Sequence, residues 1–175
     1  MNDVIIGNIC SIGAMISDSV SGTRKTEKGI LLAQCVGQIF YAAGSFILKG
    51  YSATVQNIVT IFRNTYAVYG KKNKLVEWFF VLLPVVLGLV FNNRGWLGVL
   101  PVVANLQYAL TMMFGGGDAK KLKLSLITVC VLFTVFNFVI LNFVSGIACI
   151  VTTVITSVSL IKERLNAADS ADTKE

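Results

Sequence analysis

The sequence predicts an all-α polytopic membrane protein with seven transmembrane helices. Of its 175 residues, 55% are hydrophobic and only 14% are charged, and the mean hydropathy is +0.74. A soluble domain of this length cannot bury so large an apolar fraction in one core. Apolar segments long enough to cross a bilayer recur along the chain and are separated by short polar or basic loops. We therefore expect a single membrane domain over residues 1–164.

The most polar of the predicted spans covers residues 51–69. Drawn as a helix, it gathers its polar side chains within about 140° of one another and leaves apolar side chains on the opposite side. These polar residues are Ser52, Gln56, Asn57, Thr60, Arg63 and Asn64. Small polar groups often hold neighbouring helices together, which explains Ser52 and Thr60 but not two amides and a guanidinium on one face. The segment therefore favours a solvated pathway lined by protein.

The two spans that precede this segment also carry polar stripes. They are expected over residues 4–21 and 29–48. Asp18 lies on the stripe of the first span, and Gln34 and Gln38 lie on that of the second, at helical spacing. A carboxyl group is costly inside a membrane, so Asp18 is expected to face protein rather than lipid.

The spans that follow are more apolar. They are expected over residues 75–91, 96–114, 124–141 and 143–161, and a disordered tail over residues 165–175 follows them. The first of these is almost wholly apolar and is predicted to face lipid. Pro101 is expected to bend the next one, which also carries Asn105. Asn137 is the only strongly polar residue inside the 124–141 span, and the last span carries Ser and Thr hydroxyls without a charge.

Positive charges between the spans predict the orientation of the chain. If the N-terminus lies outside, the outside loops carry only Lys49 and Arg94. The inside segments carry three basic residues each: Arg24, Lys25, Lys28, Lys71, Lys72, Lys74, Lys120, Lys121, Lys123, Lys162, Arg164 and Lys174. Because Lys and Arg concentrate on the cytoplasmic side, we expect a cytoplasmic C-terminus. No basic segment precedes the first span, so that span is expected to be retained rather than cleaved as a signal.

Composition also argues against several classes of function. The net charge of +6 comes from short clusters between spans, so topology explains it and nucleic acid is not an expected partner. The four cysteines lie inside apolar segments without CxxC spacing, and the chain has no His, so neither a disulfide framework nor a metal or other cofactor is expected. Asp18 and Glu77 are the only acids near the spans. We therefore do not expect an enzyme.

A shift of 93 residues aligns the two halves of the sequence. It pairs Lys28 with Lys121, Leu48 with Leu141 and Ser52 with Ser145. Residues 4–69 and 97–162 would then be two three-helix units, and the single helix at 75–91 between them would give both units the same orientation. A coincidence of helix lengths would also produce this alignment. Parallel repeats joined by an inversion helix build transport sites near the bilayer midplane, so the repeat favours a pathway between the units.

Three segments resemble a known family. They are KGYSATVQNIVTIFRNT, LGVLPVV and FNFVILNFVSG. Together they resemble the YgjV family of bacterial inner-membrane proteins, with Arg63, Pro101 and Asn137 at positions of the family pattern, over about residues 5–164. The last span departs from that pattern, since it carries Thr and Ser where the family tends to carry Asn and Arg. The resemblance implies a multi-pass protein of the bacterial inner (plasma) membrane and implies no particular activity.

The predicted layout of three, one and three helices is similar to that of the SWEET and PQ-loop carriers, although the Pro-Gln pair that names the latter is absent. We therefore expect a carrier or facilitator for a small polar solute, embedded in the lipid bilayer. The expected solute-binding amides are Gln34, Gln38, Gln56, Asn57, Asn105 and Asn137. The alternative is a non-transporting receptor or assembly protein whose polar stripes fix helix packing, and a homo-oligomer is compatible with either.

Arg63 and Asp18 are expected to form a gate. Arg63 lies seven residues before Gly70, about 10 Å from the cytoplasmic boundary at the rise of an α-helix. Asp18 lies four residues from the end of its span, roughly 6 Å from that boundary, so an Arg63 side chain that leans toward the cytoplasm would reach it. If their helices are neighbours, the two residues would form an ion pair that closes the cytoplasmic end of the pathway. The alternative is that the Arg63 side chain extends along the membrane to water, which needs no function.

Overall fold

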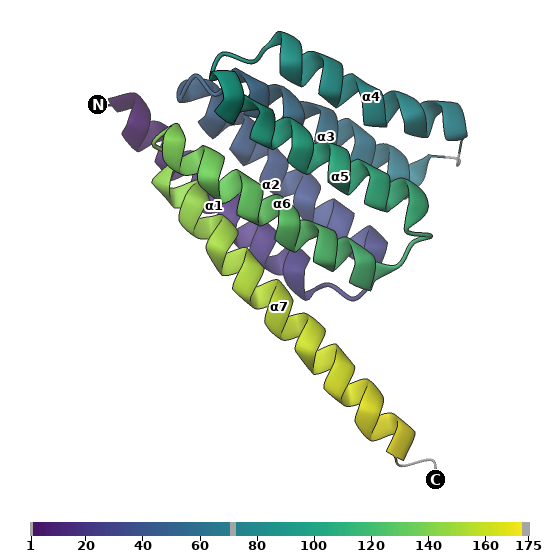
Figure 1. Ribbon diagram of the computed structural model, residues 1–175. Coiled ribbons are helices and arrows are strands. Elements are labelled where there is room, and N and C mark those ends of the chain that lie inside the picture. The colour runs from purple at the N-terminus through teal and green to yellow at the C-terminus, as the bar shows by residue number, and fades with distance from the viewer. Residues whose placement is uncertain (1, 71–72, 173–175) are drawn as a thin grey trace.

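The computed structural model describes residues 2–70 and 73–172, and this part of the chain is helical throughout apart from short connections (Figure 1). The elements are α1 (Asn2–Thr23), α2 (Glu27–Ile47), α3 (Tyr51–Tyr69), α4 (Lys74–Val90), the 3₁₀-helix η1 (Gly95–Val99), α5 (Leu100–Phe114), α6 (Ala119–Val139) and α7 (Phe143–Asp172). Each element agrees with an apolar or polar-striped segment expected from the sequence. Lys71, Lys72 and Lys174, which contribute to the predicted topology, lie outside the described residues.

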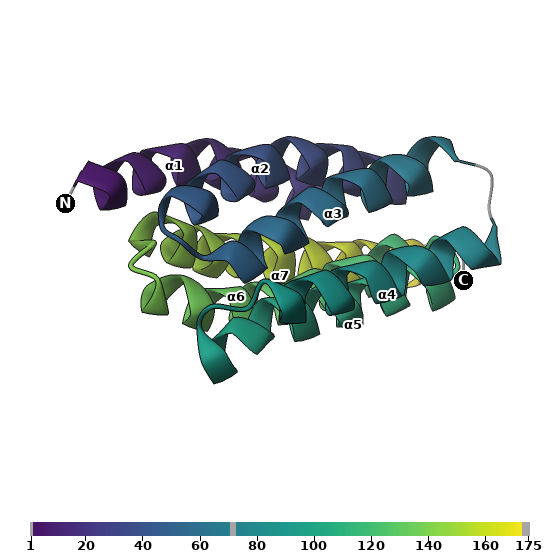
Figure 2. The ribbon, with the colours of Figure 1, turned by 90° about the horizontal axis from the view of Figure 1, so that it is seen from above.

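The helices form a closed bundle. Each helix packs against the next along the chain, as short connections between antiparallel helices require, and α1 also packs against α7. Seen from above, α1, α2 and α3 lie on one side of the bundle and α4 to α7 on the other (Figure 2). Contacts between α3 and α5 and between α2 and α6 join the two sides. Polar faces of both sides therefore meet inside the bundle.

Five helical segments of the described chain are long and apolar enough to cross a membrane. They are Asn2–Thr23, Glu27–Ile47, Gly95–Phe114, Ala119–Val139 and Phe143–Asn166. The two others fall short for different reasons: α4 has only 17 residues, and α3 carries the polar face described above. The structure therefore supports an all-helical membrane protein, and the spans at α3 and α4 stay predictions.

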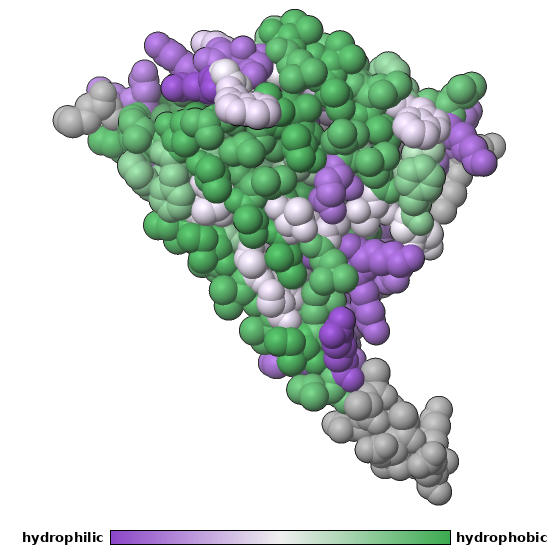
Figure 3. Space-filling model, in the orientation of Figure 1, coloured by the Kyte–Doolittle hydropathy of each residue, from purple (hydrophilic) through white to green (hydrophobic). Residues whose placement is uncertain are grey.

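The outer surface is apolar between the two ends of the bundle. Figure 3 shows hydrophobic residues over most of the visible face, with hydrophilic residues gathered toward the ends. Along α1, for example, Ile5, Ile9, Ile12 and Ile16 form an exposed stripe at helical spacing. An apolar surface of this extent is what a lipid-embedded protein requires.

Two predictions about helix ends were wrong. Pro101 does not bend a continuous helix, because the segment begins as η1 and Pro101 lies in the first turn of α5. Residues in the first turn of a helix have no helical partner for their backbone N–H groups, so the N–H that proline lacks costs no helical hydrogen bond at that position. The chain also continues as a helix from 165 to Asp172, where we expected a disordered tail. Lys, Glu, Arg, Leu and Ala, all strong helix formers, dominate the residues that follow Ile161.

The turns after α2 and after α6 have the same geometry. Lys49 and Leu141 take positive φ angles of 56° and 61°, in the left-handed region. The next residue donates its backbone N–H back to the helix over 2.8 Å in both turns, from Gly50 to the Ser45 carbonyl and from Asn142 to the Asn137 carbonyl. This pattern is the Schellman motif, here with a non-glycine residue at the strained position.

These turns change the offset of the predicted internal repeat. The equivalent positions are 92 residues apart, one fewer than the alignment of span ends predicted. The aromatic pairs that flank the turns share this offset: Phe46 and Tyr51 have ring centroids 6.0 Å apart, and Phe138 and Phe143 have theirs 6.1 Å apart. Helix ends are uncertain by one or two residues in any assignment from sequence, which accounts for the error.

Candidate functional site

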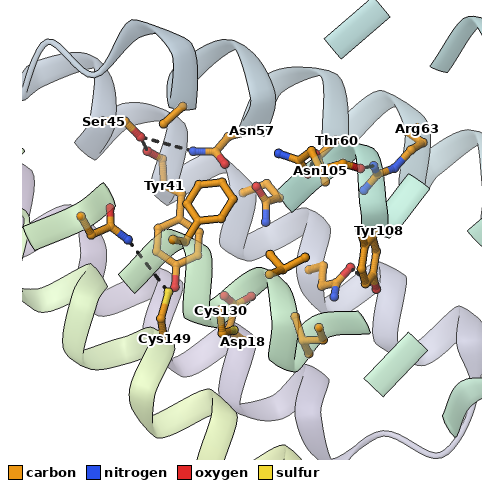
Figure 4. Close-up of a pocket in the computed structure, with 17 residues that line it drawn as sticks. Asp18, Tyr41, Ser45, Asn57, Thr60, Arg63, Asn105, Tyr108, Cys130 and Cys149 are labelled. Atoms are coloured by element: carbon orange, nitrogen blue, oxygen red, sulfur yellow. Dashed lines mark hydrogen bonds between the residues drawn. The ribbon is translucent and has the colours of Figure 1, made fainter. Parts of the chain in front are cut away.

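A polar cavity lies inside the bundle, between all of the α-helices except α4 (Figure 4). It brings together five of the six predicted amide residues and both predicted gate residues: Gln34, Gln38, Asn57, Asn105, Asn137, Asp18 and Arg63. Its volume of about 50 Å³ is room for a few water molecules. Pockets that hold small molecules usually measure about 300–1,000 Å³. The bundle is therefore closed around this site.

Gln56 is the predicted amide that does not line the cavity. Its Nε2 donates a hydrogen bond to the carbonyl of Pro84, so the side chain lies between α3 and α4. Gly88 makes room for it, because a Cβ on Gly88 would overlap the amide nitrogen. The structure thus gives Gln56 a packing contact and not a place in the candidate site.

The guanidinium group of Arg63 binds oxygens of its own helix, α3, and of the neighbouring helix α5. Its Nε and Nη2 donate to Asn64 Oδ1 at 3.4 and 3.3 Å, and its Nη1 donates to the backbone carbonyl of Asn105 at 3.4 Å. The guanidinium carbon lies 5.3 Å from the centroid of the Tyr108 ring, within the range of a cation–π contact. Arg63 is only 5% exposed, so its side chain points into the bundle and does not extend to water along the lipid face.

Gln34, a residue of α2, connects that helix to the residues around Arg63. Its Oε1 accepts hydrogen bonds from Asn64 Nδ2 at 3.2 Å and from the Tyr108 hydroxyl at 3.0 Å. On the same side of the cavity, Thr60 Oγ1 donates to Asn105 Oδ1 at 3.1 Å. Side chains of α2, α3 and α5 therefore form one buried hydrogen-bonded network around Arg63. Such networks hold their members in fixed positions when all of their groups are bonded.

Asp18 lies elsewhere on the cavity wall, on α1, and is 6% exposed. Its Oδ1 accepts no well-formed hydrogen bond among the described residues, and the Tyr41 hydroxyl, which also faces the cavity, lies close enough to interact with the Asp18 carboxyl group. Gly37 on α2 brings the two helices close together here, since a Cβ on Gly37 would lie 3.0 Å from Asp18 Oδ1. Figure 4 shows Asp18 and Tyr41 on the cavity wall, away from Arg63.

The predicted ion pair between Asp18 and Arg63 is wrong for this structure. Across the described residues, the one ion pair within 4.0 Å joins Lys123 to Glu163 at 2.6 Å. The reason lies in the order of the helices, because α1 packs chiefly against α2 and α7, whereas Arg63 extends from α3 toward α5. The two charges face one cavity without contact.

The offset of 92 residues that relates the two turns also relates two polar contacts in the cavity wall. Asn57 Nδ2 donates to Ser45 Oγ at 3.3 Å, and Asn137 Nδ2 donates to Cys149 Sγ at 3.9 Å. An offset of 92 residues pairs Ser45 with Asn137 and Asn57 with Cys149, and all four line the cavity. The two predicted three-helix units would each contribute a polar contact at an equivalent place.

Sequence reasoning missed some residues of this site. Tyr108 was not singled out, although it lies three residues after Asn105 and so on the same helix face. Cys130 and Cys149 were not among the predicted site residues, yet both line the cavity. Their positions in strongly apolar spans gave no signal of a polar surrounding.

A second cavity, of about 320 Å³, lies between α3, α4 and α5 at the end where the sequence predicts the cytoplasm. Charged residues of both signs line it, namely Glu27, Lys74, Glu77 and Arg63. We call it the vestibule. Because Arg63 lines both the vestibule and the central cavity, its side chain lies between them.

The apolar exterior, the five segments long and apolar enough to cross a membrane and the buried polar interior define a helical integral membrane protein. The chain belongs to the Imp-YgjV family, described as bacterial inner membrane protein, whose family model matches residues 5–164. This match confirms the resemblance seen in the sequence and the expected contact with the lipid bilayer. No curated protein and no solved structure matches the chain, and the likeness to the SWEET and PQ-loop layout stays a prediction.

Proposed function

We propose that this protein is a carrier or facilitator for a small polar solute, not an enzyme. The observation that carries the proposal is the central cavity, where amides, hydroxyls and two charges converge inside a bundle with an apolar exterior. Polar and ionisable groups are costly within a membrane and usually mark a solute or ion pathway. Helix packing alone requires fewer of them, and mostly small ones.

The pathway that we propose runs between two three-helix units, α1–α3 and α5–α7, which α4 joins. The matched turns at Lys49 and Leu141 and the matched polar contacts at Ser45 and Asn137 support this arrangement. Parallel repeats of this kind move against each other around a central site in many carriers. The positive charges between the helices favour an external N-terminus and a cytoplasmic C-terminus.

In the proposed cycle, Arg63 separates the central cavity from the vestibule. The network of Gln34, Asn64 and Tyr108 holds it in place. A shift of α3 relative to α5 would break the bond from Arg63 to the Asn105 carbonyl and connect the two cavities. The central cavity would then open to the cytoplasm while each helix keeps its own conformation.

The test is uptake of labelled solutes, grouped by charge class, into liposomes that contain the purified protein. Once a substrate is found, Asn57→Ala and Asn137→Ala should lower uptake at subsaturating concentration by about tenfold to a hundredfold, because each removes a buried hydrogen-bonding group worth roughly 1–3 kcal/mol. Thr128→Ala is the matched control, since Thr128 is exposed on the lipid-facing side of α6. Normal uptake by both Asn variants would make these amides structural.

The second candidate is a receptor or assembly protein that binds a ligand and does not move it. The small central cavity and its bonded network favour this candidate. A solute that raises the melting temperature of the purified protein but does not enter the liposomes would identify the protein as a receptor or assembly protein.

A further inference from the structure

The central cavity holds one acid and one base that do not neutralise each other. Asp18 and Arg63 are the only charged residues that line it within the described chain. Both are more than nine-tenths buried, and no ion pair joins them. A buried charge without a partner is unfavourable by several kcal/mol, so each of these groups favours a ligand of opposite charge.

The Arg63 side of the cavity suits a carboxylate. A guanidinium has five N–H groups in one plane, and Arg63 directs three of them to the neutral oxygens of Asn64 and Asn105. Two N–H groups are left without a partner among the described residues. The planar fork of Arg binds a carboxylate through paired hydrogen bonds, which makes it the usual partner of that group.

The Asp18 side suits an ammonium group. Asp18 Oδ1 is a buried acceptor without a cationic partner, and the only side chain that interacts with this carboxyl group among the described residues is the neutral hydroxyl of Tyr41. Together they offer two oxygens to a donor in the cavity. An ammonium group has three N–H donors and a positive charge, so it satisfies both oxygens and neutralises the carboxylate.

We propose that the solute of this carrier is a compact zwitterion, with its carboxylate at Arg63 and its ammonium group at Asp18. This inference rests on the proposed transport function. A solute with only one charge would leave either Asp18 or Arg63 buried and unpaired, whereas a zwitterion pairs both and adds no net charge to the membrane interior. The small volume of the cavity favours molecules of the size of glycine or alanine.

The first experiment compares solutes that differ only in charge. Wild-type protein in liposomes is offered labelled glycine, glycolate, glycinamide and glycolamide, and then alanine, lactate, alaninamide and lactamide. We expect the zwitterion of each series to enter about tenfold or more faster than its three analogues, because it alone pairs both charges. Faster entry of an anion or a neutral amide would overturn this inference and leave the carrier function standing. Failure of all eight, and of the broader solute panel, would overturn the carrier function as well.

The second experiment uses Asp18→Asn, which removes the charge and keeps the size of the side chain. We expect the ratio of alanine uptake to lactate uptake to fall about tenfold or more. Both rates are measured in the same preparation, so a change in protein amount or fold cancels in the ratio. An unchanged ratio would overturn the pairing with Asp18.

If Asp18→Asn does not fold, thermal unfolding of the wild-type protein supplies the result. Alanine should raise its melting temperature, and lactate and alaninamide at equal concentration should not. Equal stabilisation by all three compounds would overturn the inference that the solute is a zwitterion.

Discussion

Gln56 and Asn57 are neighbours in the chain, yet they have different surroundings. Gln56 binds the Pro84 carbonyl of α4, and Asn57 binds Ser45 at the central cavity. A step of one residue turns a helix by about 100°, which is enough to move a side chain from one interface to the next. Both residues lie on one broad polar face of α3, so the sequence pattern alone did not separate them.

This difference predicts different effects of substitution. Gln56→Met should lower the free energy of unfolding by about 1 kcal/mol through loss of the bond to Pro84, and it should leave solute affinity unchanged because Gln56 does not line the cavity. Thermal unfolding in detergent and the KM of uptake measure the two effects. Asn57→Ala is the matched comparison and should raise KM. A raised KM with normal stability in Gln56→Met would show that Gln56 contributes to solute binding.

At the scale of the elements, the helices were largely predictable and their connections were not. Apolar stretches and polar stripes determine where a membrane helix lies, so each expected span has a counterpart. The offset of the repeat depended instead on the turns FILKGY and FVILNF, in which aromatic residues flank a strained position. A left-handed residue is usually Gly or Asn, and Lys49 and Leu141 therefore gave no such signal.

The strained turn at Leu141 predicts a stabilising substitution. Leu141→Gly should raise the free energy of unfolding by roughly 0.5–1 kcal/mol, because glycine takes a positive φ without a steric cost. Thermal unfolding in detergent measures the change. Val139→Gly is the matched control, since Val139 is also an exposed apolar residue but lies in the last turn of α6. It should destabilise by about 1 kcal/mol. Destabilisation of similar size in both variants would show that Leu141 stabilises the turn through its side chain.

For the molecule as a whole, the sequence predicted which residues meet but not which ones bind each other. Polar side chains of a membrane protein turn inward, so seven of the eight predicted site residues line one cavity. The ion pair between Asp18 and Arg63 failed because counting residues gives depth in the membrane and says nothing of the order of helices around the bundle. That order places α1 beside α7.

The number of spans depends on α4. Its 17 residues give a length of about 25 Å, which is slightly shorter than a hydrocarbon core of about 30 Å. At the end of the bundle that holds its C-terminus, the loop after α4 is bound to the turn after α2, since Asn93 Nδ2 donates to the Lys49 carbonyl and Arg94 Nη2 donates to the Leu48 carbonyl. If α4 crosses the membrane, its two ends face opposite compartments.

A single cysteine at the start of α4 or in η1, which follows α4, tests both this crossing and the orientation of the protein. Leu75 and Trp96 are 81% and 86% exposed, so Leu75→Cys and Trp96→Cys should be accessible to a reagent in water without disturbing the fold. In a background where the four native cysteines are replaced, a membrane-impermeant maleimide should label Trp96→Cys in intact cells. Leu75→Cys should react only after permeabilisation, because the basic residues near it favour the cytoplasm. The reverse pattern would overturn the orientation, and labelling of both positions from one side would show that α4 does not cross and that the protein has fewer than seven spans.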